Sequence, residues 1–220
     1  MENGGFVPFQ FEEKTEDQML ASSKAFYEEM NRRRSVREFS DKPVSIEVIK
    51  NIIRSAGTAP SGAHKQPWSF CVVQDASIKS KIRAAAEQEE YENYHGRMSE
   101  EWLKDLEKFD TNHIKPFLEI APYLIVVFKQ AYNEDGSTRG RNYYVNESVG
   151  IAVGMLLAAI QNAGLVALTH TPSPMNFLAE ILERPKNERA YLLIPVGYPV
   201  DECMVPDIER KKIEEICKVY

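Results

Sequence analysis

Apolar positions follow two spacings along the chain, one typical of helices and one typical of buried strands. Helical spacing predicts helices over residues 14–33, 46–57, 78–94, 100–109, 142–163 and 176–182, with a weaker one over 208–216. Short runs rich in β-branched residues predict strands at 70–73, 124–128, 165–169 and 192–196. The elements do not alternate in a regular strand–helix–strand rhythm, so the pattern predicts an α+β fold.

The helix expected over 142–163 is apolar nearly all round, which indicates the core or a subunit interface. Its continuous apolar run, 149–160, is too short to cross a bilayer, which requires roughly 20 residues. The helices expected over 78–94 and 100–109 are rich in charge, and we expect solvent to cover both. Ser45 stands directly before an apolar helical pattern, and we expect it to be the N-cap of that helix.

Composition narrows the class of protein. The chain has 220 residues, 43% of them hydrophobic, enough to bury the core of one domain. Its net charge of −6 argues against a nucleic-acid binder, whose affinity depends on neutralised phosphates. Three widely spaced cysteines indicate a reducing compartment, and no signal-like segment opens the chain. We therefore expect a cytoplasmic protein without a membrane anchor.

Two polar segments predict a ligand. Arg32 to Arg37 hold four arginines around Ser35, and guanidinium groups bind phosphate oxygens in pairs. The competing interpretation is a solvated helix end, where cations are also favourable. The second segment, 59–68, contains Pro60 and Gly62, and its small residues allow backbone N–H groups to approach a flat ligand. Together the two segments predict a phosphorylated aromatic cofactor.

A charged stretch in the middle of the chain carries a second candidate site. Glu90 and Tyr94 are four residues apart and share one helix face, and Trp102 and Lys115 follow. A carboxylate, a phenol and an ammonium group would suit an amino-acid zwitterion. The alternative is a solvated surface pair in an acidic stretch.

Other chemistries are not indicated. The sequence has no dinucleotide fingerprint, Walker loop or nucleophile elbow. Its four histidines lack metal-ligand spacing, and residues 133–136 fit a hairpin tip better than a calcium loop. We predict no metal site.

Four motifs carry a family resemblance: Arg33–Arg37, Thr58–His64, Asn162–Val166 and Leu193–Pro199. They resemble the nitroreductase superfamily of FMN proteins, and with the charged stretch they resemble its iodotyrosine deiodinase family closely. The resemblance runs from about Phe26 to the C-terminus. It implies an N-terminal extension, 1–25, and one FMN-binding domain, 26–220, with a substrate lid at about 87–115. The implied fold is a nitroreductase-like α+β sandwich in a domain-swapped homodimer, with FMN at the subunit interface.

The resemblance also implies the site residues. Cofactor binding is implied for Arg33, Arg34, Ser35, Arg37, Pro60, Ser61, Gly62, Thr169, His170, Thr171 and Arg210. Substrate binding is implied for Ala63, Glu90, Tyr94, Trp102 and Lys115. Three residues are expected to act on the reacting atoms: Arg37 at the flavin pyrimidine edge, Ala63 through its N–H on a phenolate, and Thr169 near flavin N5. His170 stands where some relatives have threonine.

The implied reaction is FMN-dependent reductive dehalogenation of halotyrosines, converting iodotyrosine to tyrosine and iodide in one-electron steps. The implied electron donor is external, of the NAD(P)H reductase, flavodoxin or ferredoxin type. Two alternatives remain: an NAD(P)H-dependent nitroreductase or flavin reductase, and a non-catalytic FMN-binding protein.

Overall fold

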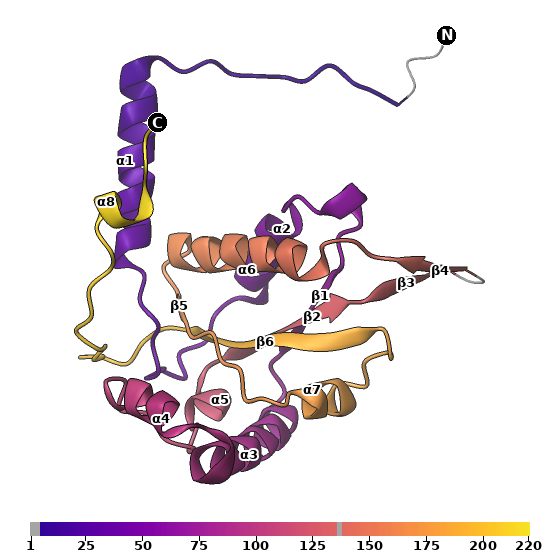
Figure 1. Ribbon diagram of the computed structural model, residues 1–220, viewed down its shortest axis with the longest axis vertical. Coiled ribbons are helices and arrows are strands. Elements are labelled where there is room, and N and C mark those ends of the chain that lie inside the picture. The colour runs from indigo at the N-terminus through magenta and orange to yellow at the C-terminus, as the bar shows by residue number, and fades with distance from the viewer. Residues whose placement is uncertain (1–4, 136–137) are drawn as a thin grey trace. The chain divides into compact units, whose positions relative to one another are not determined.

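The computed structural model describes residues 5–135 and 138–220 and divides into two compact units, Met1–Arg33 and Arg34–Tyr220 (Figure 1). The first unit is an extended segment followed by helix α1 (Glu16–Arg32), close to the expected 14–33. A capping box between Thr15 and Gln18 starts this helix, and none of its residues is buried. The unit therefore has no core within a single chain.

The second unit contains the remaining elements. Its helices are α2 (Ile46–Gly57), the short η1 (Gly62–His64), α3 (Ala76–Glu92), the π-helical turn η2 (Asn93–Arg97), α4 (Glu100–Glu107), α5 (Phe117–Ile120), α6 (Val145–Asn162), α7 (Asn176–Ile181) and α8 (Ile213–Ile216). Its strands are β1 (Trp68–Val73), β2 (Tyr123–Gln130), β3 (Tyr132–Asp135), β4 (Thr138–Arg141), β5 (Val166–Ala167) and β6 (Glu188–Gly197).

An antiparallel sheet of order β1-β2-β6-β5 forms the middle layer (Figure 1). Both faces are buried, as the central strand β2 makes clear. Tyr123, Ile125 and Val127 pack in the cluster with α2 and α6, while Leu124, Val126 and Phe128 pack in the cluster with α3, α5 and α7. Because successive side chains of a strand point to opposite faces, one strand contributes to two hydrophobic cores. The expected α+β sandwich is confirmed.

The longest periodic segments form helices near their expected positions. The Ser45 hydroxyl accepts a hydrogen bond from the Glu47 N–H (3.3 Å), which confirms the N-cap of α2. The expectation that solvent covers helix 78–94 is wrong, because Ile82, Ala86 and Glu90 of α3 are buried. The buried side of α3 also carries two charged residues, Lys79 and Glu90. Helix α4 has no fully buried residue, as expected.

The strand expected over 165–169 is shorter in the structure, where β5 holds only Val166 and Ala167. The chain keeps irregular pairing beyond it, since the backbone N–H of His170 donates to the Leu193 carbonyl (2.9 Å) and the reverse bond is 3.0 Å. The intervening Thr169 is exposed. Likewise, only the end of the helix expected over 208–216 is helical, as α8.

The turn expected at 133–136 is wrong for its first three residues, because Asn133, Glu134 and Asp135 belong to strand β3 of a hairpin. Strands β3 and β4 pair through Asn133↔Gly140 and Asp135↔Thr138, and Gly136 lies outside the described residues.

Two backbone contacts fix the site-bearing segments relative to α6. The Val36 N–H donates to the Ala167 carbonyl (3.2 Å), and Ser35 bridges Ala167, which lies beyond the C-terminal end of α6. The Gly62 N–H donates to the hydroxyl of Ser148 (3.3 Å), in the first turns of the same helix. With 18 residues, α6 is about 27 Å long at 1.5 Å per residue. The arginine–serine segment and the Pro60–Ala63 loop of one chain therefore lie at opposite ends of α6.

Candidate active site

A cavity of about 180 Å³ lies between the segment 90–117, Arg37 and the segment 168–171 that follows β5. It is lined by half of the residues that the sequence places in the site: Arg37, Glu90, Tyr94, Trp102, Lys115, Thr169, His170 and Thr171. The structure thus brings the expected carboxylate, phenol and ammonium together, beside an arginine and a threonine from distant parts of the chain.

A loose ion pair occupies the centre of this cavity wall. Lys115 Nζ lies 3.6 Å from Glu90 Oε2, and the two residues are only 4% and 6% exposed. Burial raises the pKa of Glu90 and lowers the pKa of Lys115, and their mutual attraction only partly offsets this in each case. Since 3.6 Å is too long for a direct hydrogen bond, each charge can still accept a closer partner of opposite sign.

Lys115 is held in place by its neighbours. Its ammonium group donates to the Thr111 hydroxyl (3.1 Å) and to the Asn112 carbonyl. Its backbone N–H donates to Glu87 Oε1 (2.7 Å), and the same carboxylate oxygen accepts from Arg83 Nε (2.7 Å). Arg83 and Glu87 are therefore positioning residues that sequence reasoning missed, because they lie among many similar surface charges of α3.

Tyr94 lies in the π-helical turn η2 that follows α3. Its hydroxyl donates to the Thr111 carbonyl (3.2 Å), and Lys115 Nζ lies 5.6 Å from its ring centroid. Burial raises the pKa of Tyr94, so its phenol keeps its proton at neutral pH. Trp102 also lines the cavity and is 55% exposed.

Arg37 lines this cavity and also a second cavity of about 310 Å³. Ser35 and Pro206 line the second cavity with it. Its guanidinium carbon lies 5.4 Å from the ring centroid of Phe109 in a cation–π contact. Burial lowers the pKa of Arg37, although a guanidinium stays charged throughout the physiological range. Within the described part of the chain it forms no ion pair with a carboxylate, so its charge is available to an anionic ligand.

His170 is the most perturbed group of the site. Burial, and then the nearby charges of Lys115 and Arg37, lower its pKa to about 3. Its imidazole packs edge-on against Phe117, with ring centroids 5.6 Å apart. At neutral pH His170 is therefore uncharged.

The remaining arginines expected at the cofactor lie outside this cavity. Arg33 ends α1 in the first unit, its N–H donating to the Met30 carbonyl (3.2 Å). The Arg34 guanidinium donates to the Pro206 carbonyl, and Arg210 is exposed. Since Pro206 also lines the cavity that holds Ser35 and Arg37, its contact with Arg34 places this guanidinium near that cavity.

The Pro60–Ala63 loop does not line the 180 Å³ cavity. Its backbone is unusual, because Ala63, His64 and Gln66 have φ angles of 49°, 54° and 47°. Left-handed conformations are costly for residues with a side chain and concentrate at ligand-binding segments. Gly62 has no room for a side chain, since a Cβ would lie 2.9 Å from the Tyr143 carbonyl oxygen.

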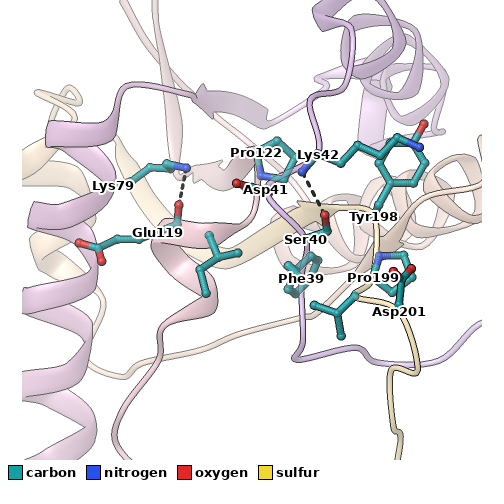
Figure 2. Close-up of a pocket in the computed structure, with 12 residues that line it drawn as sticks. Phe39, Ser40, Asp41, Lys42, Lys79, Glu119, Pro122, Tyr198, Pro199 and Asp201 are labelled. Carbon is teal, nitrogen blue, oxygen red and sulfur yellow. Dashed lines mark hydrogen bonds between the residues drawn. The ribbon is translucent and has the colours of Figure 1, made fainter.

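A larger cavity, of about 860 Å³, lies elsewhere, between the segment 39–42, Lys79 and the segment 198–201 (Figure 2). The Lys79 ammonium group donates to the carbonyls of Glu119 (2.6 Å) and Ala121 (2.9 Å). No predicted site residue lines this cavity, so volume alone does not locate the active site.

Two kinds of feature are absent from the part of the chain that the structure describes. There, no group of three or more histidine, cysteine or acidic side chains is arranged to hold a metal ion. Among the same residues, no helix has both the length and the hydropathy needed to span a membrane.

Comparison with known proteins identifies the class. The model of the nitroreductase family matches residues 30–198, and the chain belongs to the nitroreductase family. Within it, the chain is 60% identical to an iodotyrosine deiodinase of Haliscomenobacter hydrossis over 217 residues, covering 98% of this chain and 97% of that protein. It is 48% identical to human iodotyrosine deiodinase 1 over 217 residues, covering 98% of this chain and 75% of that one.

Solved structures agree with this grouping. A crystal structure of oxidised iodotyrosine deiodinase bound to FMN and 3-iodo-L-tyrosine superimposes with a TM-score of 0.74 at 32% identity, covering 85% of this chain and 95% of that chain. A BluB-like flavoprotein of Clostridium difficile, at 24% identity and a TM-score of 0.68, shares the fold. The family and fold expected from the sequence motifs are confirmed.

The buried neutral His170 predicts a specific loss of stability in acid. Unfolding restores its ordinary pKa of 6.5, so below pH 6.5 the unfolded chain binds a proton that the folded chain refuses until about pH 3. Stability is therefore lost as the pH falls through this window, by on the order of 2 kcal/mol between pH 7 and pH 5. Urea unfolding at the two pH values should show this excess loss in the wild type but not in His170→Leu. Equal losses in both proteins would contradict the assignment of His170 as a buried neutral base.

Proposed function

We propose that this protein is an FMN-dependent halotyrosine dehalogenase that converts iodotyrosine to tyrosine and iodide. The observation that carries the proposal is the buried, loosely paired Glu90 and Lys115 beside Arg37 and Thr169 in one cavity. The iodotyrosine deiodinases that the chain resembles along 98% of its length supply the reaction.

The residues present fit FMN. Arg34 and Ser35, with Arg33 beside them in sequence, offer the donors that a phosphate requires, and Arg210 would add a further cation. Arg37 offers a half-buried guanidinium without a carboxylate partner among the described residues, which suits the anionic edge of a reduced flavin ring. The loop formed by Pro60, Ser61 and Gly62 would line the ring, with Thr169, His170 and Thr171 from the other side.

The substrate cavity fits a zwitterion by charge. Glu90 would bind the ammonium group of the amino acid, and Lys115 with the Tyr94 hydroxyl would bind its carboxylate. Arg37 and Lys115 are cationic and Glu90 is anionic, so the cavity carries one net positive charge. A halotyrosine bound as its phenolate carries one net negative charge, so the complex is balanced. A monoanion without the amino group would instead place Glu90 against uncompensated negative charge.

The length of α6 supports a homodimer in which each site is built from both chains. The Pro60–Ala63 loop and the Ser35–Arg37 segment of one chain are separated by a helix of about 27 Å, too far to hold one ring system together. Apolar side chains that a monomer leaves in water are consistent with an extensive interface: Phe6, Phe9, Phe11, Ile151, Ile213 and Ile216. In the dimer, the loop of one chain would complete the cavity of the other.

The roles of the chain's own residues follow from this placement. The Ala63 N–H would hold the phenolate oxygen, and the Thr169 hydroxyl would donate to the flavin N5 region. The lid residues Glu90, Tyr94, Trp102 and Lys115 would fix the amino-acid end and exclude water from the ring. Bound FMN supplies the two reducing equivalents in one-electron steps. One proton and two electrons are consumed as the carbon–iodine bond is replaced by carbon–hydrogen and iodide leaves.

The electrons would come from an external donor, because the sequence contains no dinucleotide fingerprint; an NAD(P)H reductase, a flavodoxin and a ferredoxin are the candidate classes. The three free cysteines, Cys71, Cys203 and Cys217, support a cytoplasmic location. The runner-up function, an NAD(P)H-dependent nitroreductase or flavin reductase, would have no use for the Glu90–Lys115 pair.

The reaction itself can be tested without knowing the donor. Protein reduced with dithionite under anaerobic conditions should release one iodide per flavin when 3-iodotyrosine is added, with reoxidation of the flavin. Iodophenol, which lacks the amino-acid end, should react far more slowly. Absence of iodide together with rapid NADPH-driven nitroarene reduction would move the protein to the runner-up function.

Glu90→Gln should weaken 3-iodotyrosine binding by about 30-fold or more, because it removes the ammonium partner and leaves Lys115 buried without its counter-charge. FMN binding should change little. Titration of flavin fluorescence measures 3-iodotyrosine binding, and the flavin retained after dialysis measures FMN binding. Glu107→Gln, the same substitution at an exposed position of the lid segment, is the control and should leave both unchanged. Equal losses of both ligands in Glu90→Gln would remove Glu90 from the substrate site.

Heterodimers test the shared site. Ala63→Glu and Arg37→Ala should each abolish iodide release as homodimers. A heterodimer of the two variants, isolated with two affinity tags, has one site with neither substitution if each site uses both chains, and should retain about half of wild-type activity. If each site used a single chain, both sites of the heterodimer would carry one substitution. An inactive heterodimer that retains the wild-type mass would therefore reject the shared site.

A further inference from the structure

Arg37 occupies a shared position in the candidate site. Among the described residues, it alone lines both the cavity of about 180 Å³ and the cavity of about 310 Å³. Phe109 also lines the larger of the two, and the guanidinium carbon of Arg37 lies 5.4 Å from the centroid of its ring. This distance is within the range of a cation–π contact. The ring of Phe109 is therefore in contact with the one side chain that both cavities have in common.

The backbone fixes Phe109 at the end of α4. Its N–H donates to the Leu106 carbonyl (2.9 Å), and the N–H of the next residue, Asp110, donates to the Glu107 carbonyl (3.1 Å). Asp110 has a φ of 44°, a left-handed conformation that turns the chain away from α4 and that aspartate tolerates better than most residues. Phe109 therefore follows α4 in a defined place, with its side chain half-buried.

The partner of the Arg37 guanidinium is a ring and not a carboxylate. Within the described part of the chain, no ion pair and no side-chain hydrogen bond includes Arg37. Glu38, the acidic residue beside it, accepts the Met204 N–H instead (3.1 Å). A carboxylate would cancel the positive charge and occupy N–H donors, whereas the face of a ring attracts the cation and does neither. Lys108 Nζ also lies 5.3 Å from the Phe109 centroid, but Lys108 is exposed and its charge is solvated.

We propose that Phe109 is a positioning residue, whose ring holds the Arg37 guanidinium in the place where its charge stabilises the anionic reduced flavin. The inference rests on the proposed function, because it assumes that the anionic edge of reduced FMN lies at Arg37. The ring limits the freedom of a long side chain and removes water from part of the cation. Both effects strengthen the action of the charge on an anion, because less reorganisation is needed and the local dielectric is lower. An aliphatic side chain would fill similar space but would not attract the cation.

The test measures the reduction potential of bound FMN, so that no turnover enters the readout. Saturating 3-fluorotyrosine occupies the substrate cavity, and its strong carbon–fluorine bond resists reductive cleavage. Phe109→Leu should make the reduction of FMN about three- to tenfold less favourable, because the anionic product is less stabilised. For a two-electron couple this is a fall of about 14 to 30 mV. Phe109→Tyr, which keeps the aromatic face, should retain the wild-type potential.

A double-mutant cycle separates this role from a general disturbance of the segment. Arg37→Gln alone should lower the potential, and adding Phe109→Leu to it should cause no further fall, because the ring acts only through the cation. Equal potentials in the wild type and Phe109→Leu, an equal fall in Phe109→Tyr, or the same fall with and without Arg37 would each overturn the inference. Wild-type protein that retains FMN but binds neither 3-fluorotyrosine nor 3-iodotyrosine would instead reject the proposed function.

Discussion

The length of one helix constrains how this chain can form a site. Helix α6 holds the loop around Gly62 at its start through Ser148, and the segment around Ser35 is paired with Ala167 beyond its end. A rigid helix cannot shorten, so these two segments, which we propose bind the cofactor, do not meet within one chain. The proposed homodimer would bring them together. The first unit, Met1–Arg33, which buries none of α1 by itself, is consistent with the same requirement.

The buried charges of the cavity show a balance between stability and recognition. Burial acts against the charged forms of both Glu90 and Lys115, and a pair separated by 3.6 Å does not fully compensate it. In the proposed substrate site, a tighter pair would have to be broken before a zwitterion could bind. The loose pair would therefore leave part of its burial cost for the ligand to relieve. Thr111 and Asn112 hold the Lys115 ammonium group, and Glu87 with Arg83 holds its backbone, so the 3.6 Å gap lies between a fixed lysine and Glu90.

Much of the fold could be predicted from the sequence, because long periodic segments such as α2 and α6 are determined by local pattern. The short strand β5 could not, since its length depends on pairing with β6 rather than on its own residues. The sequence pattern did not predict the buried face of α3, because many charged residues lie along this helix. Motifs and residue types identified the candidate site residues in the sequence. The distances between these residues depend on tertiary contacts, which the sequence pattern does not contain. The unpaired state of His170 Nε2 depends on every neighbour at once, which no local pattern records.

The π-helical turn at Asn93–Arg97 has a consequence for how this family can diversify. The Met98 N–H reaches back five residues to the Asn93 carbonyl (3.0 Å), so the turn contains one residue more than an α-helix would. Deleting one residue there would rotate the segment that follows, including Lys115, by about 100° relative to Glu90. If these residues bind the amino-acid end of the substrate as proposed, the loss of a single codon would abolish that recognition and leave the rest of the scaffold intact. Lineages on this scaffold could exchange substrates by indels in the lid, without any change in the sheet.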